Sequence, residues 1–354
     1  MPIVAHNELP SFERLQQEGV NVLSPERAHS QYIRELHIGL LNMMPDAALA
    51  ATERQFFRLV GESNPIAQFY MHPFTLPHLQ RSAKAQAYVD RYYEPFEQIR
   101  EQGLDALIIT GANVVGPELA NQPFWDPLIE VIDWAAEQVT STLCSCLATH
   151  AVLQFRYGQH RRPQPDKIWG VFPHAVVNKK HPLVADVNTR FDVPHSRWNA
   201  VERDQFDDAR LRVLVESEEV GVHLATSPDG LRFVFFQGHP EYDTISLIKE
   251  FKREVIRFGG REIERFPPFV SNYFKQRDKA VIREFAQRLR MAIADGKALP
   301  EFPEHLIVPD LDNTWHDTAE AVVGNWMGLV YQVTHRERNK PFMDGVDPNN
   351  PLGL

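Results

Sequence analysis

The chain has 354 residues, is 43% hydrophobic and carries a formal net charge of −10. This length can bury a substantial core, and the acidic balance argues against a nucleic-acid binder that works through a broad basic face. The N-terminus lacks the pattern of an export signal, and the chain has no apolar run of about 18 residues. We therefore expect a cytoplasmic enzyme that neither enters a membrane nor binds nucleic acid, while a homodimer stays compatible with the sequence.

The first half of the chain alternates between buried strands and helices. Apolar runs at 36–44, 67–71, 106–110 and 139–145 are typical of buried parallel strands. Helical patterns follow around Arg54 to Leu59 and at 83–102, 127–138 and 147–157. This order predicts an α/β fold with a doubly wound, mostly parallel sheet.

The second half begins with shorter β-like segments. Residues 225–234 predict a hairpin that turns on Asp229-Gly230, and 233–237 is the last strong strand pattern. Residues 241–258 are expected to form a helix that covers this strand. A long amphipathic helix is expected at 272–295, outside the core sheet.

Cys144 and Cys146 are the only two cysteines, which is too few for a disulfide framework or a cysteine zinc site. Cys146 follows a predicted strand and precedes a predicted helix, so it can occupy a nucleophile elbow. There the helix N-terminus would favour a thiolate. Cys144 lies on the strand itself, and we interpret it as core packing. Position alone also allows Cys146 to be an inert buried thiol.

The segment Gly238-His239-Pro240-Glu241 follows the strand predicted at 233–237. A histidine here would lie at the carboxyl edge of the sheet, where Cys146 is also expected, and Glu241 could orient its imidazole. The same residues could instead form a helix N-terminus without catalytic function. The pairing with a strand-end cysteine favours a catalytic triad of Cys146, His239 and Glu241.

This arrangement resembles the class I glutamine amidotransferase fold and, more specifically, the homoserine O-acyltransferase family. The matching pieces occur in the family's order: Met1-Pro2-Ile3, Glu8-Leu9-Pro10, Leu41-Asn42, Met44-Pro45, Thr110-Gly111-Ala112, Thr140-Ser141-Thr142-Leu143, Pro194-His195-Ser196-Arg197, Gly238-His239-Pro240-Glu241-Tyr242-Asp243, Asn325-Trp326 and Tyr331-Gln332. We expect an N-terminal segment at 1–35 packed on the core, a catalytic domain at 36–262, and a helical extension at 263–354 that completes one globular unit.

The resemblance implies a ping-pong reaction that starts methionine biosynthesis from homoserine. Acyl-CoA, a co-substrate, would acylate Cys146, and the homoserine hydroxyl, deprotonated by His239, would then attack the thioester. Lys167, Ser196 and Arg253 would bind the amino acid, with no cofactor and no metal. Val115 matches the acyl-specificity position, where the family has glycine for succinyl and glutamate for acetyl donors. Valine avoids the charge of glutamate, so succinyl-CoA is slightly favoured over acetyl-CoA.

The chain also departs from the family pattern. Asp46-Ala47-Ala48 replaces a pair of lysines after Met44-Pro45, Thr318 stands where the family has histidine, and the 272–295 helix resembles an insertion. Other functions therefore stay open. The acceptor could be serine or another hydroxy amino acid, or the triad could serve a glutamine amidotransferase, a hydrolase, or a silent interaction protein.

Overall fold

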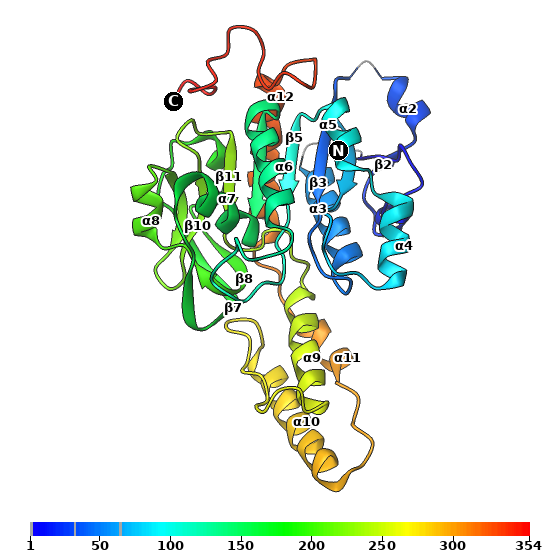
Figure 1. Cartoon of the computed structure of the whole chain (residues 1–354). Coiled ribbons are helices and arrows are strands. Elements are labelled where there is room, and N and C mark those ends of the chain that lie inside the picture. Colours follow the sequence, from blue (N-terminus) through cyan, green and yellow to red (C-terminus); the bar gives the residue numbers. More distant parts are fainter. Residues whose placement is uncertain (1–2, 32, 64–65) are drawn as a thin grey trace.

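The computed structural model describes residues 3–31, 33–63 and 66–354 (Figure 1). The Met1-Pro2 part of the family pattern lies outside these residues. In the described chain an eleven-stranded sheet has the order β2-β1-β4-β3-β5-β6-β11-β10-β9-β7-β8. Within these ranges no helix is both long and apolar enough to span a bilayer.

The strands from β2 to β11 in this order all run parallel. The remaining strands continue the sheet in antiparallel fashion. The expected doubly wound, mostly parallel α/β sheet is thus confirmed. The parallel strands are β1 (Ile3–Val4), β2 (Val22–Leu23), β3 (Glu35–Leu41), β4 (Gln68–Phe74), β5 (Ala106–Ile109), β6 (Ser141–Ser145) and β11 (Phe233–Phe236), and the antiparallel ones are β7 (Arg162–Val176), β8 (Arg190–Ala200), β9 (Arg212–Ser217) and β10 (Gly221–Thr226).

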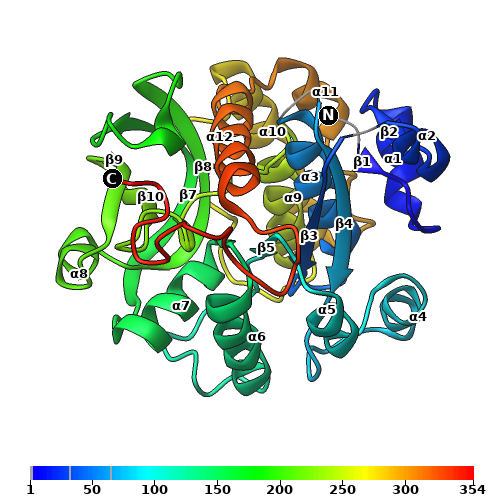
Figure 2. The same cartoon turned by 90° about the horizontal axis from the view of Figure 1, so that it is seen from above.

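Helices cover both faces of the sheet, as Figure 2 shows. One face packs against α1 (Pro10–Gln17), α3 (Leu49–Glu62) and α12 (His316–Val333). The other packs against α5 (Phe96–Gln102), α6 (Trp125–Gln138) and α7 (Leu147–Tyr157). The residues facing each side form separate apolar clusters, which explains why the central strands are hydrophobic on both faces.

Three short helical elements complete the fold, and the helix expected at 83–102 is divided into two. The short elements are α2 (Pro25–His29), α8 (Arg203–Asp208) and the 3-10 turn η1 (Pro182–Val184). The single helix expected at 83–102 was wrong, because the structure has α4 (Ala83–Tyr92) and then α5. Tyr93 has an extended backbone at the end of α4, and Pro95, whose nitrogen carries no proton, directly precedes α5.

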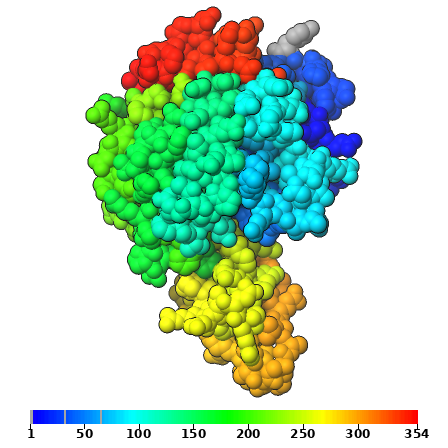
Figure 3. All heavy atoms as spheres, in the orientation of Figure 1, coloured from blue at the N-terminus to red at the C-terminus, as the bar shows by residue number. Residues whose placement is uncertain are grey.

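A helical unit stands out from the body below the sheet (Figures 1 and 3). It contains α9 (Ser246–Gly259), α10 (Gln276–Asp295), α11 (Glu304–Ile307) and the 3-10 turn η2 (Val308–Asp310). Its aromatic core includes Phe251, Phe285 and Phe302, together with Trp169 from β7. Helices α9 and α10 begin later than the expected residues 241 and 272. The segment before α9 contains turns, and Asn272, before α10, has a positive φ of 54°.

The hairpin expected at 225–234 is confirmed. Thr226 pairs with Val234 across antiparallel β10 and β11. Asp229 Oδ1 accepts hydrogen bonds from the amides of Leu231 at 2.9 Å and Arg232 at 2.7 Å, and Gly230 supplies the positive φ of 88° that closes the turn.

The C-terminal helix α12 is anchored to the central sheet by Trp326. Its indole is 1% exposed, and Nε1 donates to Ser141 Oγ at 2.7 Å. The cluster around it unites side chains from α1, α3 and α12 with the strands. Helix α12 therefore completes the core of the sheet, while α10 and α11 lie outside it, and the division at 35 and 262 stays a prediction.

Trp326→Ala should lower the free energy of unfolding by about 3–5 kcal/mol, because it removes a large buried side chain and leaves Ser141 without its donor. Chemical denaturation with Trp198→Ala as the matched control would measure this loss. Trp198 is 45% exposed on β8, so its truncation should change stability by about 0.5 kcal/mol or less. Equal losses in the two variants would contradict the anchoring role.

Candidate active site

Cys146 lies in the sharp turn between β6 and α7. It has φ 51° and ψ −107°, a strained backbone for a non-glycine residue. Its amide donates to Phe236 O at 2.7 Å, which ties the turn to the end of β11. Gly111 faces it from the loop after β5, since a Cβ there would lie 3.5 Å from Cys146 Cβ. Cys146 therefore occupies a sharp strand-to-helix turn of the kind expected for a nucleophile elbow.

Cys144 has a different environment. It is fully buried in the cluster under α6 and α7, and burial raises the pKa of its thiol well above the usual range. The interpretation of Cys144 as core packing is confirmed.

His239 lies directly after β11, and its ring is held between a carboxylate and the cysteine. Nδ1 donates to Glu241 Oε1 at 2.8 Å, and Cys146 is near enough to the ring for its charge to raise the pKa of His239. Burial opposes protonation of His239, but the charges of Glu241 and Cys146 outweigh it and raise its pKa well above the ordinary value. The three predicted triad residues are thus brought together, and the imidazolium form of His239 is favoured.

The turn that carries His239 is fixed from two sides. The amide of His239 donates to Pro194 O at 2.8 Å, and the Tyr242 ring stacks on the imidazole at 4.3 Å between centroids. Gly238 is required here, because a Cβ would approach Val193 to 2.5 Å and His195 to 2.9 Å. The histidine therefore has little freedom to rotate away from Cys146.

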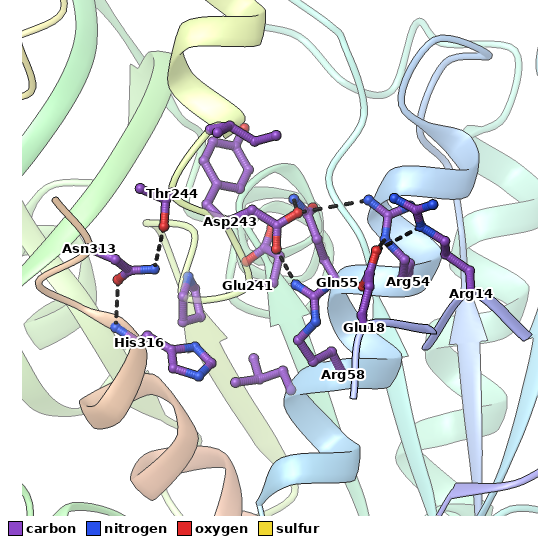
Figure 4. Close-up of a pocket in the computed structure, with 14 residues that line it drawn as sticks. Arg14, Glu18, Arg54, Gln55, Arg58, Glu241, Asp243, Thr244, Asn313 and His316 are labelled. Atoms are coloured by element: carbon purple, nitrogen blue, oxygen red, sulfur yellow. Dashed lines mark hydrogen bonds and ion pairs between the residues drawn. The ribbon is translucent and has the colours of Figure 1, made fainter. Parts of the chain in front are cut away.

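A cavity of about 440 Å³ lies behind Glu241 and the residues after it (Figure 4). Arg54 and Arg58 of α3 enter it, and Arg58 pairs with both Glu18 and Asp243. Gln55 donates to Asp243 Oδ2 at 3.1 Å. The arginine charges are balanced by these carboxylates, and the network holds the turn that follows the triad.

Lys167 and Ser196 meet at a partly buried carboxylate that no sequence motif indicated. Glu250 on α9 accepts hydrogen bonds from Lys167 Nζ at 3.1 Å, Ser196 Oγ at 2.6 Å and the Tyr242 hydroxyl at 2.6 Å. Burial raises the pKa of Glu250, but the Lys167 charge and these hydrogen bonds prevail and hold it below the usual value. Because Tyr242 also stacks on His239, this cluster is adjacent to the triad.

Arg253 and Val115, the other two predicted site residues, lie in more open surroundings. Arg253 is on α9 three residues after Glu250, its side chain is 50% exposed, and Nε lies 3.4 Å from Glu254 Oε1. Val115 is 57% exposed in the loop after β5, and its carbonyl accepts a hydrogen bond from Asn199 at 2.9 Å. The contacts join Lys167 and Ser196 to one cluster but leave Arg253 and Val115 outside it.

Two buried arginines add positive charge beside the cysteine, and the sequence analysis missed both. Burial lowers the pKa of Arg197 to about 10, against the opposing influence of Cys146. Burial also lowers the pKa of Arg161, and the Cys146 charge opposes this. The Arg161 guanidinium donates to the carbonyls of Val114 and Pro117. Arg197 belongs to the Pro-His-Ser-Arg segment, which was the available signal, whereas Arg161 had none.

Three buried histidines, His174, His195 and His223, pack together near His239. His174 and His195 stack at 5.1 Å between centroids, and His223 lies 5.9 Å from His195. Burial is the largest cause that lowers the pKa of all three, to about 4 for His174. These rings are therefore neutral at neutral pH and do not repel the imidazolium of His239.

The fold and the site define a class: a doubly wound α/β enzyme that carries a cysteine, a histidine and a glutamate at the carboxyl edge of its parallel strands. The homoserine O-succinyltransferase family model matches residues 2–336. Homoserine O-succinyltransferases of Allochromatium vinosum and Thiobacillus denitrificans are 66% and 68% identical, and each alignment covers 100% of this chain and 99% and 100% of the relative. The chain belongs to this family and is an acyltransferase.

Solved structures with a similar backbone include glutamine amidotransferases. The one from Methylobacillus flagellatus has a TM-score of 0.46 and 15% identity, covering 84% of this chain and 95% of the other. The one from Thermotoga maritima has a TM-score of 0.42 and 11% identity, covering 85% and 98%.

His150, on α7 one turn after Cys146, should make the protein sensitive to acid. Burial, reinforced by Arg161 and Arg197, lowers its pKa from 6.5 to about 3. Below pH 6.5 the unfolded chain binds a proton that the folded chain rejects, so stability falls as the pH falls. The contribution of His150 should drop by about 2 kcal/mol between pH 7 and pH 5.

Denaturant titrations at several pH values would measure this slope. His150→Gln should flatten it, since glutamine does not titrate, while His305→Gln, on the exposed face of α11, should leave it unchanged. Parallel curves for the wild type and His150→Gln would show that His150 does not titrate in this range.

Proposed function

We propose that this chain transfers a succinyl group from succinyl-CoA to the side-chain hydroxyl of L-homoserine, at the start of methionine biosynthesis, through a thioester on Cys146. The observation that carries the proposal is the position of His239, which is hydrogen-bonded to Glu241 and near enough to Cys146 for the charge of the cysteine to raise its pKa. The relatives support this choice of substrates, because they are named homoserine O-succinyltransferases and align with the whole length of this chain.

In the first half-reaction the Cys146 thiolate attacks the thioester carbonyl carbon of acyl-CoA. Backbone amides in the first turn of α7, which have no partner within the helix, are suited to hold the oxyanion, and Gly111 leaves room for it. The bond to the CoA sulfur then breaks, and His239 gives its proton to the departing thiolate. The products are an acylated Cys146 and free CoA.

In the second half-reaction the neutral His239 accepts the proton of the homoserine hydroxyl as this oxygen attacks the acyl carbon. The Cys146 thiolate leaves, and the thiolate–imidazolium pair is restored. Glu241 keeps Nδ1–H engaged, so that the other ring nitrogen faces the reacting atoms in both steps.

The acceptor site follows from the charges on α9. Glu250 is a partly buried carboxylate adjacent to the triad and suits the ammonium group of an amino acid, while Arg253 suits its carboxylate. Lys167 and Ser196 then serve the amino acid by positioning Glu250. A bare alcohol satisfies neither charge and should be a poor acceptor. The mechanism needs acyl-CoA as co-substrate and no cofactor.

Cys146→Ala should abolish transfer, and Cys144→Ala should retain most of it, because only Cys146 lies at the elbow. Acyl-CoA without acceptor should add one acyl mass to the wild type and to Cys144→Ala, and none to Cys146→Ala. Intact-protein and peptide mass spectrometry would measure this. An acyl mass on a peptide that lacks Cys146 would refute the mechanism.

The roles of the two other triad residues predict different losses. His239→Ala should lose both half-reactions, while Glu241→Ala should keep part of its activity, because the imidazole remains although poorly oriented. Single-turnover acylation and deacylation rates would separate the steps. Equal residual rates in the two variants would argue against a general base at 239, and glutaminase activity without CoA-dependent transfer would favour the amidotransferase alternative.

The donor preference depends on position 115. Val115→Glu should depress kcat/KM for succinyl-CoA more than for acetyl-CoA, because a carboxylate there would repel the succinyl carboxylate. Val115→Gly should keep or improve succinyl transfer. Measuring kcat/KM for both donors in the three proteins reports differential transition-state binding. An equal effect of Val115→Glu on both donors would remove position 115 from the acyl-binding site.

A further inference from the structure

Two histidines and a glutamate converge on the far side of the parallel sheet from the triad cysteine. His6 follows β1, His72 lies on β4, and Glu94 connects α4 to α5. One nitrogen or oxygen atom from each lies within 4.8 Å of the other two. In the sheet order β4 is separated from β6 by β3 and β5, so this cluster does not belong to the site around Cys146.

The backbone fixes the ligands of this cluster before any ion binds. The amide of Glu94 donates to Pro73 O at 2.9 Å, next to His72, and Glu94 Oε1 lies 2.7 Å from His72 Nδ1. The His6 ring packs against Tyr70 and Phe12 at 5.4 and 5.9 Å between centroids. His72 is buried, while His6 and Glu94 are partly exposed, which leaves access from solvent.

Both imidazoles have the outer contacts that metal-binding histidines use. A ligating histidine usually donates its other ring N–H to an acceptor, which fixes its tautomer. Nδ1 of His6 lies 3.1 Å from Val4 O, and Nε2 has only a long contact of 3.4 Å with the exposed Asn7 amide nitrogen, which an ion would displace. Nε2 of His72 lies 2.8 Å from His37 Nδ1, and His37 Nε2 lies 3.2 Å from Glu35 Oε1. Nδ1 of His72 is hydrogen-bonded to Glu94 Oε1 at 2.7 Å, so the proton between them must leave and the two atoms must separate when an ion binds.

We propose that His6, His72 and Glu94 bind a zinc ion that fastens the N-terminal segment to β4. Two imidazole nitrogens and one carboxylate oxygen suit Zn²⁺, whereas Mg²⁺ and Ca²⁺ prefer oxygen ligands alone. Tetrahedral zinc holds its ligand atoms roughly 3.4 Å apart at bond lengths of about 2.1 Å. The three atoms lie within 4.8 Å of one another, so side-chain movements on the order of 1 Å would bring them to that spacing.

The site would be structural, because the ion would hold together three separate parts of the chain, with water in the fourth position around the zinc. The strands of the N-terminal segment, β1 and β2, are only two residues long and offer few ladder hydrogen bonds. A zinc ion shared between His6 and His72 would replace part of the missing strand pairing. Zinc should then stabilise the folded chain by mass action.

Zinc titration of a tag-free, chelator-stripped Cys146→Ala chain tests this proposal, since the substitution removes the competing thiolate. Calorimetry and elemental analysis should give one Zn²⁺ per chain, with a higher Tm and no comparable response to Mg²⁺. In that background Glu94→Gln and His6→Asn should weaken zinc binding at least tenfold and abolish the Tm shift. Glutamine can still hydrogen-bond to His72, so the Glu94→Gln fold should survive, as circular dichroism would verify.

Glu97→Gln and His29→Asn are the matched controls. Both residues are exposed, Glu97 lies three positions from Glu94, and each variant makes the same chemical change outside the cluster. They should bind zinc as the parent does. Absence of saturable zinc binding, or the same affinity in Glu94→Gln as in Glu97→Gln, would overturn the site.

Discussion

The parallel pairing of β6 with β11 is the constraint on which the site depends. Ser145 faces Phe236 at the ends of these strands, and the next residues along each strand begin the two turns that carry Cys146 and His239. The hydrogen bond from Cys146 N to Phe236 O joins the turns directly. A slip of one residue in this register would reverse which side chains face the helices and separate the cysteine from the histidine.

Around this pair the protein uses burial to assign charge. Desolvation keeps His174, His195 and His223 neutral, whereas His239, equally buried, is favoured as a cation because Glu241 and Cys146 adjoin it. Buried Arg161 and Arg197 add positive potential without pairing with the cysteine directly. The same desolvation therefore produces opposite protonation states, which are decided by the immediate neighbours.

The sequence was sufficient for elements with a strong local signal. Long apolar strands and the elbow at Cys146 were predictable because burial and turn chemistry act over a few residues. The strands β1 and β2 were not, since a two-residue strand has no periodicity. The break of 83–102 was readable from Pro95 and was overlooked.

In the site, the triad could be predicted from motif order, but Glu250 could not. Its importance arises from Lys167, Ser196 and Tyr242, which lie far apart in sequence and meet only through the packing of α9 against β7 and β8. A glutamate on an amphipathic helix normally belongs to the solvated face, and nothing local distinguishes this one.

The protruding helical unit shares α9 with the proposed acceptor-binding surface. Phe251, the residue after Glu250, packs in the same aromatic cluster as Phe285 of α10 and Trp169 of β7. The orientation of the Glu250 carboxylate is thus set in part by an aromatic core that lies on the other side of α9. Because protein cores are close-packed, the exchange of one aromatic ring for another in that distant core would move Glu250 while every polar residue around it is retained.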